Sequence, residues 1–131
     1  MNIATLRAEG LDLELKAVCD SLSLNIDSSW KNGDTKRNGG IYTKSGFNAC
    51  IADTNTSKNL TTLINQFVTN CKVNNLNFSS SSLSAQLDIG LGVGASEQFT
   101  ASIKFSPNEL KCFKEIGLEL CISAYPISDN E

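Results

Sequence analysis

The chain has 131 residues, of which 40% are hydrophobic and 19% are charged, a composition typical of one globular domain whose core needs no disulfide or metal. Its eleven Lys and Arg residues are scattered and are outnumbered by fourteen Asp and Glu, for a net charge of −3. We therefore expect a single domain over residues 1–131 that does not bind nucleic acid, because phosphate binding needs a dense basic surface.

The N-terminal half predicts strands where apolar and polar residues alternate, and amphipathic helices where apolar residues recur three and four positions apart. Ala4, Leu6 and Ala8 share one face of the first strand, which Gly10 ends. In order, the predicted elements are a strand over 3–8, a helix over 11–22, a short strand at 24–26, a polar loop over 27–40, a strand over 41–52 and a helix through 60–71.

The C-terminal half has the clearest alternation. Residues 83–94 and 99–105 are two alternating runs joined by a turn, which predicts an antiparallel hairpin. Ser106-Pro107-Asn108-Glu109 then predicts the start of a helix, which Gly117 ends, and residues 118–124 predict a last strand. The order β-α-(β)-β-α-β-β-α-β favours an α+β fold, in which three helices pack on one face of a mainly antiparallel sheet.

Residue types that carry common chemistry are missing from the sequence. The chain has no histidine, which removes the commonest general base and the imidazole metal ligands. The glycines of GLGVG at 90–94 lack the spacing and the following helix of a nucleotide-binding loop, and a flat strand face explains them better. The five cysteines include no Cys-x-x-Cys pair. Cys19, Cys71 and Cys112 lie on or beside apolar faces of predicted helices, where a free cysteine behaves as a small hydrophobe, so we expect a structural role rather than a redox or metal one. We expect no enzyme, no catalytic residue, no cofactor and no metal site.

The location of the protein is predicted from two further features. No stretch approaches the roughly 18 apolar residues of a membrane-spanning helix. The beginning of the chain, MNIATLRAEGLDLEL, lacks an apolar segment behind a basic one, as a secretory signal would have. We therefore expect a cytoplasmic protein that does not bind membranes, with its cysteines reduced.

Residues 28–40 form the first candidate for a contact surface. They carry the only tryptophan of the chain among several charged residues, and Trp and Arg are frequent in interface hot spots. The alternative, which we favour slightly, is that Trp30 folds back onto the sheet edge while the charges are solvated. The candidate partner-binding residues of this segment are Trp30, Lys31, Asp34 and Arg37.

Acidic residues around the first predicted helix form the second candidate. They include Asp20 and form either a patch that meets a basic partner or, as we favour, a solvated face near a helix N-terminus. The candidate partner-binding residues here are Glu9, Asp12 and Glu14.

Several segments are each compatible with one known family. They are the strand and helix start LRAEGLDL, the run from Trp30 to Asp34, the helix NLTTLINQFV, and the tail FTASIKFSPNELKCFKEIGLELCISAYP. Taken in order, they resemble a bacterial family known only as domain of unknown function 4279. The match is weakest in the middle of the chain, which is rich in Asn and Ser.

The resemblance implies a function that the residues alone do not. Members of the family are small stand-alone bacterial proteins without established enzymatic activity, and some lie beside genes for contact-dependent toxins. This implies an immunity protein that binds and neutralises a cognate toxin domain, such as a nuclease, in the cytoplasm. The alternative prediction is a small-molecule-binding or regulatory α+β domain with a pocket between sheet and helices.

Overall fold

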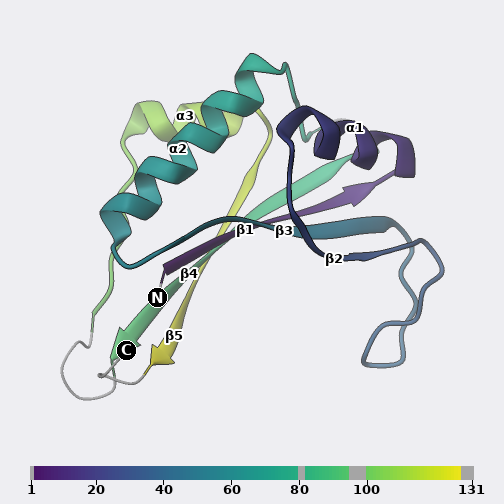
Figure 1. Ribbon diagram of the computed structural model, residues 1–131, viewed down its shortest axis with the longest axis horizontal. Coiled ribbons are helices and arrows are strands. Elements are labelled where there is room, and N and C mark those ends of the chain that lie inside the picture. Colours follow the sequence, from purple (N-terminus) through teal and green to yellow (C-terminus); the bar gives the residue numbers. More distant parts are fainter. Residues whose placement is uncertain (1, 80–81, 95–99, 128–131) are drawn as a thin grey trace.

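The computed structural model describes residues 2–79, 82–94 and 100–127, and three helices lie on one side of a five-stranded sheet (Figure 1). This confirms the predicted α+β fold with a mainly antiparallel sheet. In chain order the elements are β1 (Asn2–Gly10), α1 (Asp12–Leu22), β2 (Ile26–Trp30), β3 (Ser45–Thr54), α2 (Ser57–Val73), β4 (Ser84–Gly94), α3 (Pro107–Glu115) and β5 (Glu119–Ile127).

The first strand lies at the centre of the sheet, whose order is β2-β3-β1-β4-β5. β1 is antiparallel to both β3 and β4, and β2 is antiparallel to β3. β4 and β5 are parallel, so the chain must cross over between them, and α3 lies in that connection. Among the described residues, β2 and β5 form the two edges.

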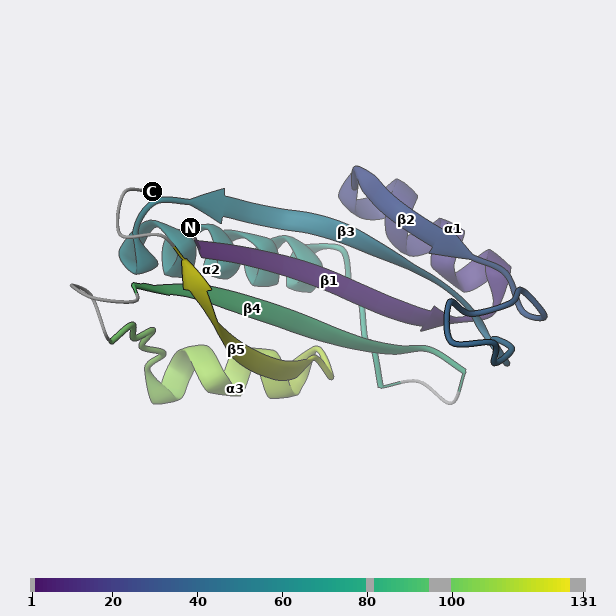
Figure 2. The same cartoon turned by 90° about the horizontal axis from the view of Figure 1, so that it is seen from below.

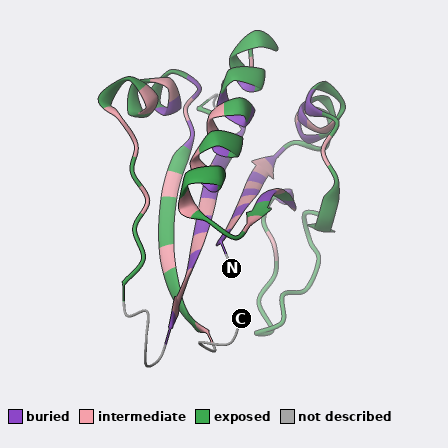
Figure 3. Ribbon diagram, turned by 60° about the vertical axis from the view of Figure 1, so that its left-hand side comes forward, coloured by how far each residue is buried: buried purple, intermediate pink, exposed green. Residues whose placement is uncertain are grey.

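The core lies between the helices and the face of the sheet that they cover. In β1 every second residue is buried, and Leu6 is completely buried opposite Ala49 and Leu87. α2 supplies one buried stripe, visible as the purple inner side of its ribbon in Figure 3. The buried residues of that stripe are Leu60, Ile64, Phe67, Val68 and Cys71. Strict alternation leaves the other residues of β1 pointing away from the helices.

The predicted hairpin partner over 99–105 is wrong where the structure describes it. Residues 100–106 have no regular secondary structure, and the start of the run lies outside the described residues. β5 occupies the edge of β4 that the hairpin would have used. Ile103 and Phe105 instead pack against the core, with Phe105 edge-on to Phe113 at a ring-centroid distance of 5.3 Å. The alternation therefore marked a half-buried extended segment, not a paired strand.

The predicted loop over 27–40 begins too early, because β2 extends to Trp30. Four of the five residues of β2 are exposed. An edge strand of this kind has no buried face of alternating apolar residues, so the periodicity used for prediction is missing. Its place in the sheet comes from backbone pairing with β3.

The N-terminus of α3 is closed by the predicted capping box. The Ser106 hydroxyl accepts the backbone N–H of Glu109 at 3.2 Å, and the Glu109 carboxylate accepts the backbone N–H of Ser106 at 2.7 Å. The same carboxylate accepts a hydrogen bond from Asn65 of α2. These bonds, the Ser106 backbone bond first, lower the pKa of Glu109 below its ordinary 4.5.

The charge of Glu109 is expected to make the stability of the protein depend on pH. Because the folded-state pKa is lowered, the stabilisation is complete above about pH 4.5 and is lost as the pH falls through the folded-state pKa. Glu109→Gln keeps the shape and removes the charge, so its midpoint of thermal unfolding should lie below that of the wild type at pH 7, and the difference should shrink as the pH falls below 4.5. Glu119→Gln on edge strand β5 is the control; a Glu109→Gln deficit that does not shrink on acidification would contradict the assignment.

Candidate functional site

None of the helices in the described part of the chain lies over one face of the sheet (Figure 2). We call this surface the open face. The centre of the open face is hollowed, and the hollow has a volume of about 800 Å³. Four of the five strands contribute residues to the floor of the hollow, and β2 contributes one residue at its margin. The residues that line this hollow are Ile3, Thr5 and Arg7 of β1, Asp27 of β2, Asn48 of β3, Gln86, Asp88, Ile89, Gly90 and Gly92 of β4, and Cys121, Ser123, Tyr125 and Ile127 of β5.

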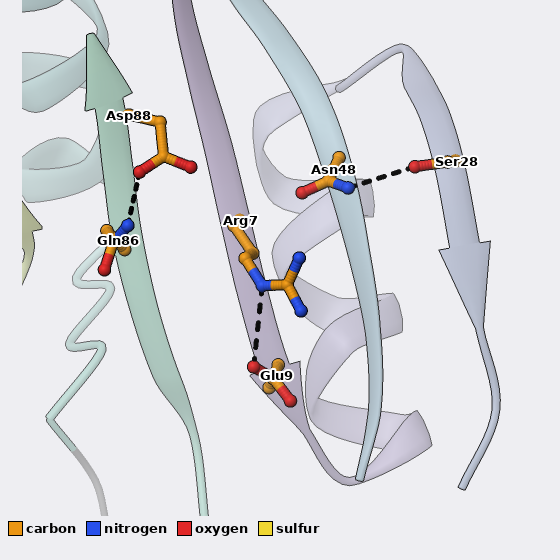
Figure 4. A network of polar contacts seen from close by, with 6 residues as sticks. All are labelled: Arg7, Glu9, Ser28, Asn48, Gln86 and Asp88. Atoms are coloured by element: carbon orange, nitrogen blue, oxygen red, sulfur yellow. Dashed lines mark hydrogen bonds and ion pairs between the residues drawn. The ribbon is translucent and has the colours of Figure 1, made fainter. Parts of the chain in front are cut away.

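Polar side chains cross the open face in rows set by the strand register (Figure 4). Arg7 of β1 lies between its partners Asn48 of β3 and Gln86 of β4. The Asn48 amide donates to the Ser28 hydroxyl at 3.1 Å, and the Gln86 amide donates to the carboxylate of Asp88. These bonds hold the amide side chains in fixed orientations on an otherwise solvent-facing surface.

One wall of the hollow depends on a glycine. Gly90 of β4 lies beside the ring of Tyr125 on the neighbouring strand β5, and a Cβ at Gly90 would lie 2.7 Å from that ring. Only glycine admits so close an approach. The interpretation of GLGVG as a flat strand face is therefore confirmed at Gly90. The Tyr125 side chain that lies against it remains more than half exposed.

Carboxylates dominate the charge of the open face. By strand register, Asp53 lies opposite Ile3, and Glu119 lies opposite Gln86, so both share the face with Asp27, Asp88 and Glu9. Among the described strand residues, Arg7 is the only cation. The pKa of the exposed Cys50 thiol is raised, first by partial burial and then by the negative charges of Asp27 and Asp53. The raised pKa of Cys50 is therefore due in part to the negative potential of these two carboxylates.

The segment between β2 and β3, residues 31–44, leaves the sheet on the side away from the helices (Figure 1). We call it the arm. Gly33 donates to the carbonyl of Tyr42 at 2.7 Å, Tyr42 donates to the carbonyl of Asp34 at 2.9 Å, and Lys36 donates to the carbonyl of Gly40 at 2.7 Å. Gly39, at a φ of 89°, closes the tip with a left-handed residue. The arm is thus a hydrogen-bonded hairpin with a defined shape.

A column of stacked side chains joins the arm to the sheet. The guanidinium of Arg7 lies 4.5 Å from the Trp30 ring centroid, and the Trp30 ring stacks on Tyr42 at 4.9 Å with an interplanar angle of 18°. The Lys36 ammonium lies 5.3 Å from the Tyr42 ring, and Glu9 binds the other side of Arg7 at 3.6 Å. Cation–π contacts and aromatic stacking therefore fix the arm against β1.

Trp30 is only 7% exposed, so the alternative that it folds back onto the sheet edge is confirmed. A Cβ at Gly46 would lie 2.4 Å from the indole ring, which means that the ring lies directly on the backbone of β3. Covered by Arg7 and Tyr42, the indole supports the surface around it more than it adds contact area of its own.

Six of the seven predicted partner-binding residues lie in or around the arm and the adjoining end of β1, and Glu14 lies apart from them. The Lys31 ammonium lies 3.6 Å from the Asp12 carboxylate, and the backbone N–H of Lys31 donates to Asp34 at 2.8 Å. Hydrogen bonding to Ser45, and then the charge of Lys31, lowers the pKa of Asp12. Glu14 accepts a hydrogen bond from Ser82 instead.

Sequence reasoning missed the floor of the open face. Asn48, Asp88 and Tyr125 come from three strands far apart in the sequence, and only the register brings them together. The available signal was the alternation itself: the polar positions of each predicted strand define the face opposite the core.

The comparisons with known proteins add no relative: no family model, no curated protein and no solved structure matches the chain. The resemblance to domain of unknown function 4279 stays a prediction. Among the described residues, no helix is long and apolar enough to cross a membrane, and no three His, Cys, Asp or Glu side chains are grouped to hold a metal ion.

Proposed function

We propose that the chain is an immunity protein, which binds a cognate bacterial toxin domain through the open face and thereby neutralises it. The observation that carries this proposal is an uncovered, acidic sheet face with a preformed arm at its margin. Binding through such a face would need little rearrangement, because the strands and the hydrogen-bonded arm already hold the contact residues in place.

The size of the open face supports a protein as the partner. Five strands spaced about 4.8 Å apart, with a central strand of about 30 Å, present on the order of 600 Å². A stable interface buries about 800 Å² on each partner. The floor together with the arm therefore approaches the area that one standard interface requires.

Charge complementarity supports a basic partner. The floor and its margins carry Glu9, Asp27 and Asp88, with further carboxylates at Asp53 and Glu119. A nuclease toxin domain would be suitably basic, since it must bind phosphates. Acidic side chains on the inhibitor would accelerate encounter with such a domain and orient it. Together with the resemblance described above, this favours a toxin over other basic proteins.

Reversing two charges on the open face is expected to abolish capture of the partner. The tagged chain would be incubated with lysate of its native bacterium, and bound proteins identified by mass spectrometry. The wild type should retain a basic toxin domain in near-equal amount, and Asp27→Lys/Asp88→Lys should retain at least tenfold less. Co-expression of that domain with the wild-type chain, but not with the double variant, should restore growth.

The matched control reverses charge on the helix side. Asp20 is an exposed residue of α1 that is paired with Lys16, and Asp20→Lys should capture the partner as the wild type does. Capture that the Asp27→Lys/Asp88→Lys variant leaves unchanged would refute the open face as the contact surface. A captured domain that does not impair growth when expressed alone would refute the immunity function.

The hollow favours one second candidate, a small-molecule-binding domain. Its volume of about 800 Å³ falls in the usual range for ligand pockets, about 300–1,000 Å³. It lies on the open face, whereas the sequence predicted a pocket between sheet and helices, where core side chains meet instead. Native mass spectrometry of the purified chain separates the candidates, because a retained metabolite would favour the second.

A further inference from the structure

A second depression of about 580 Å³ adjoins the hollow at the base of the arm. The two share Arg7 and Asn48, but their charges differ. This arm depression is lined by three cations and one carboxylate, and its remaining lining is polar or aromatic. The charged residues are Arg7, Lys36, Arg37 and Asp34.

The cations of the arm depression are available to a ligand, whereas its carboxylate is engaged. Lys36 and Arg37 form no ion pair with any residue that the structure describes. Arg7 contacts Glu9 through Nε at 3.6 Å, and its two terminal nitrogens remain. Asp34 accepts the backbone N–H of Lys31 at 2.8 Å and so is held within the arm.

Trp30, whose ring lines the same depression, carries a buried donor without a partner. Nε1 of Trp30 is buried and makes no hydrogen bond, the one buried side-chain polar atom of the described residues in this state. Leaving a buried donor unsatisfied costs about 1–3 kcal/mol.

We propose that the arm depression binds an oxyanion, a phosphate or carboxylate group of its ligand. Arg7 and Arg37 would supply planar guanidinium donors, which suit oxyanions, and Lys36 would add a mobile positive charge. Arg7 lies against the Trp30 ring and Lys36 lies against the Tyr42 ring, and the two rings stack on each other. Arg7 and Lys36 are thus positioned before any ligand arrives, which lowers the cost of binding. The site adjoins the hollow of the open face, with which it shares Arg7 and Asn48, but its binding of an oxyanion does not depend on the proposed toxin contact.

The single tryptophan allows a direct test. The ¹⁵N-labelled chain gives one indole N–H signal, which would be followed while sodium phosphate or sodium acetate is added at constant ionic strength against sodium chloride. We expect a saturating displacement of the indole signal and of arm amides, in the millimolar range. Saturation by phosphate alone assigns the site to a phosphate group, and saturation by both anions shows that a carboxylate suffices.

Variants distinguish binding in the arm depression from non-specific attraction of anions to a positively charged surface. Lys36→Gln/Arg37→Gln and Arg37→Gln alone should weaken binding, the double variant at least tenfold. Lys58→Gln/Lys104→Gln removes the same charge from another surface depression, of about 340 Å³, and should leave the dissociation constant unchanged. Failure of both anions to saturate the signal, or equal weakening by the two double variants, overturns the proposal. Because no partner protein is present, neither result bears on the toxin contact.

Discussion

Replacing Leu6 by alanine is expected to lower the free energy of unfolding by about 2–5 kcal/mol, the range for a large apolar side chain deleted from a core. Leu6 is 0% exposed at the middle of the central strand, opposite Ala49 and Leu87, which are also 0% exposed. Ala49 and Leu87 belong to β3 and β4, each of which is paired with another strand on both of its edges. The surrounding structure can therefore shift little to fill the cavity that Leu6→Ala leaves. Urea denaturation, followed by circular dichroism, measures the change.

The neighbouring residue on the same strand is the control for Leu6→Ala. Thr5 points to the open face between Cys50 and Asp88, so Thr5→Ala tests strand propensity without opening a cavity and should cost well under half as much. Equal losses in the two variants would mean that β1 is not buried on one face only, and would contradict the core described above.

Gly46→Ala is expected to lower the free energy of unfolding by about 1–3 kcal/mol, as overpacking in a rigid site does. A Cβ at this position would lie 2.4 Å from the Trp30 ring and 2.7 Å from the carbonyl oxygen of Ala8. The ring is held by Arg7 and Tyr42 and the carbonyl belongs to the central strand, so neither can yield cheaply. Displacement of the indole should also shift the tryptophan emission maximum toward longer wavelength.

Gly40→Ala is the matched glycine control, because a Cβ there would meet only the side chains of Asn38 and Lys36 at 3.2 and 3.5 Å. It should change stability by less than about 0.5 kcal/mol and leave the emission maximum in place. A Gly46→Ala variant as stable as the wild type, with unchanged emission, would show that Trp30 does not lie on β3.

The sequence predicts those parts of the fold whose residues have one buried face. β1, α2 and β4 alternate or repeat apolar residues and appear in the structure within a few residues of their predicted bounds. The short strand predicted at 24–26 overlaps β2 only at Ile26, because the next residues of β2 are exposed and paired only through the backbone. A strand was wrongly predicted over 99–105, because an extended segment there half-buries Ile103 and Phe105, as one face of a strand would.

Part of the candidate site could likewise be predicted from the sequence, and part of it could not. Trp30, Lys31 and Asp34 could be singled out because they are close in the sequence and of unusual composition. The floor could not, because its members are ordinary polar residues that become neighbours only through register. The stacking of Arg7 on Trp30 joins residues from the central strand and the edge of the sheet, and no local pattern marks such a pair.

The central position of β1 has a consequence for how the chain folds. β1 precedes both of its partners in the chain, and these begin at Ser45 and Ser84. During synthesis one edge of β1 therefore stays unpaired until β3 has been made, and the other until β4 has been made. Closing loops of this length delays strand pairing, so folding should be slower than that of a helical domain of equal size. Until β4 has been made, a nascent chain exposes one edge of this apolar central strand.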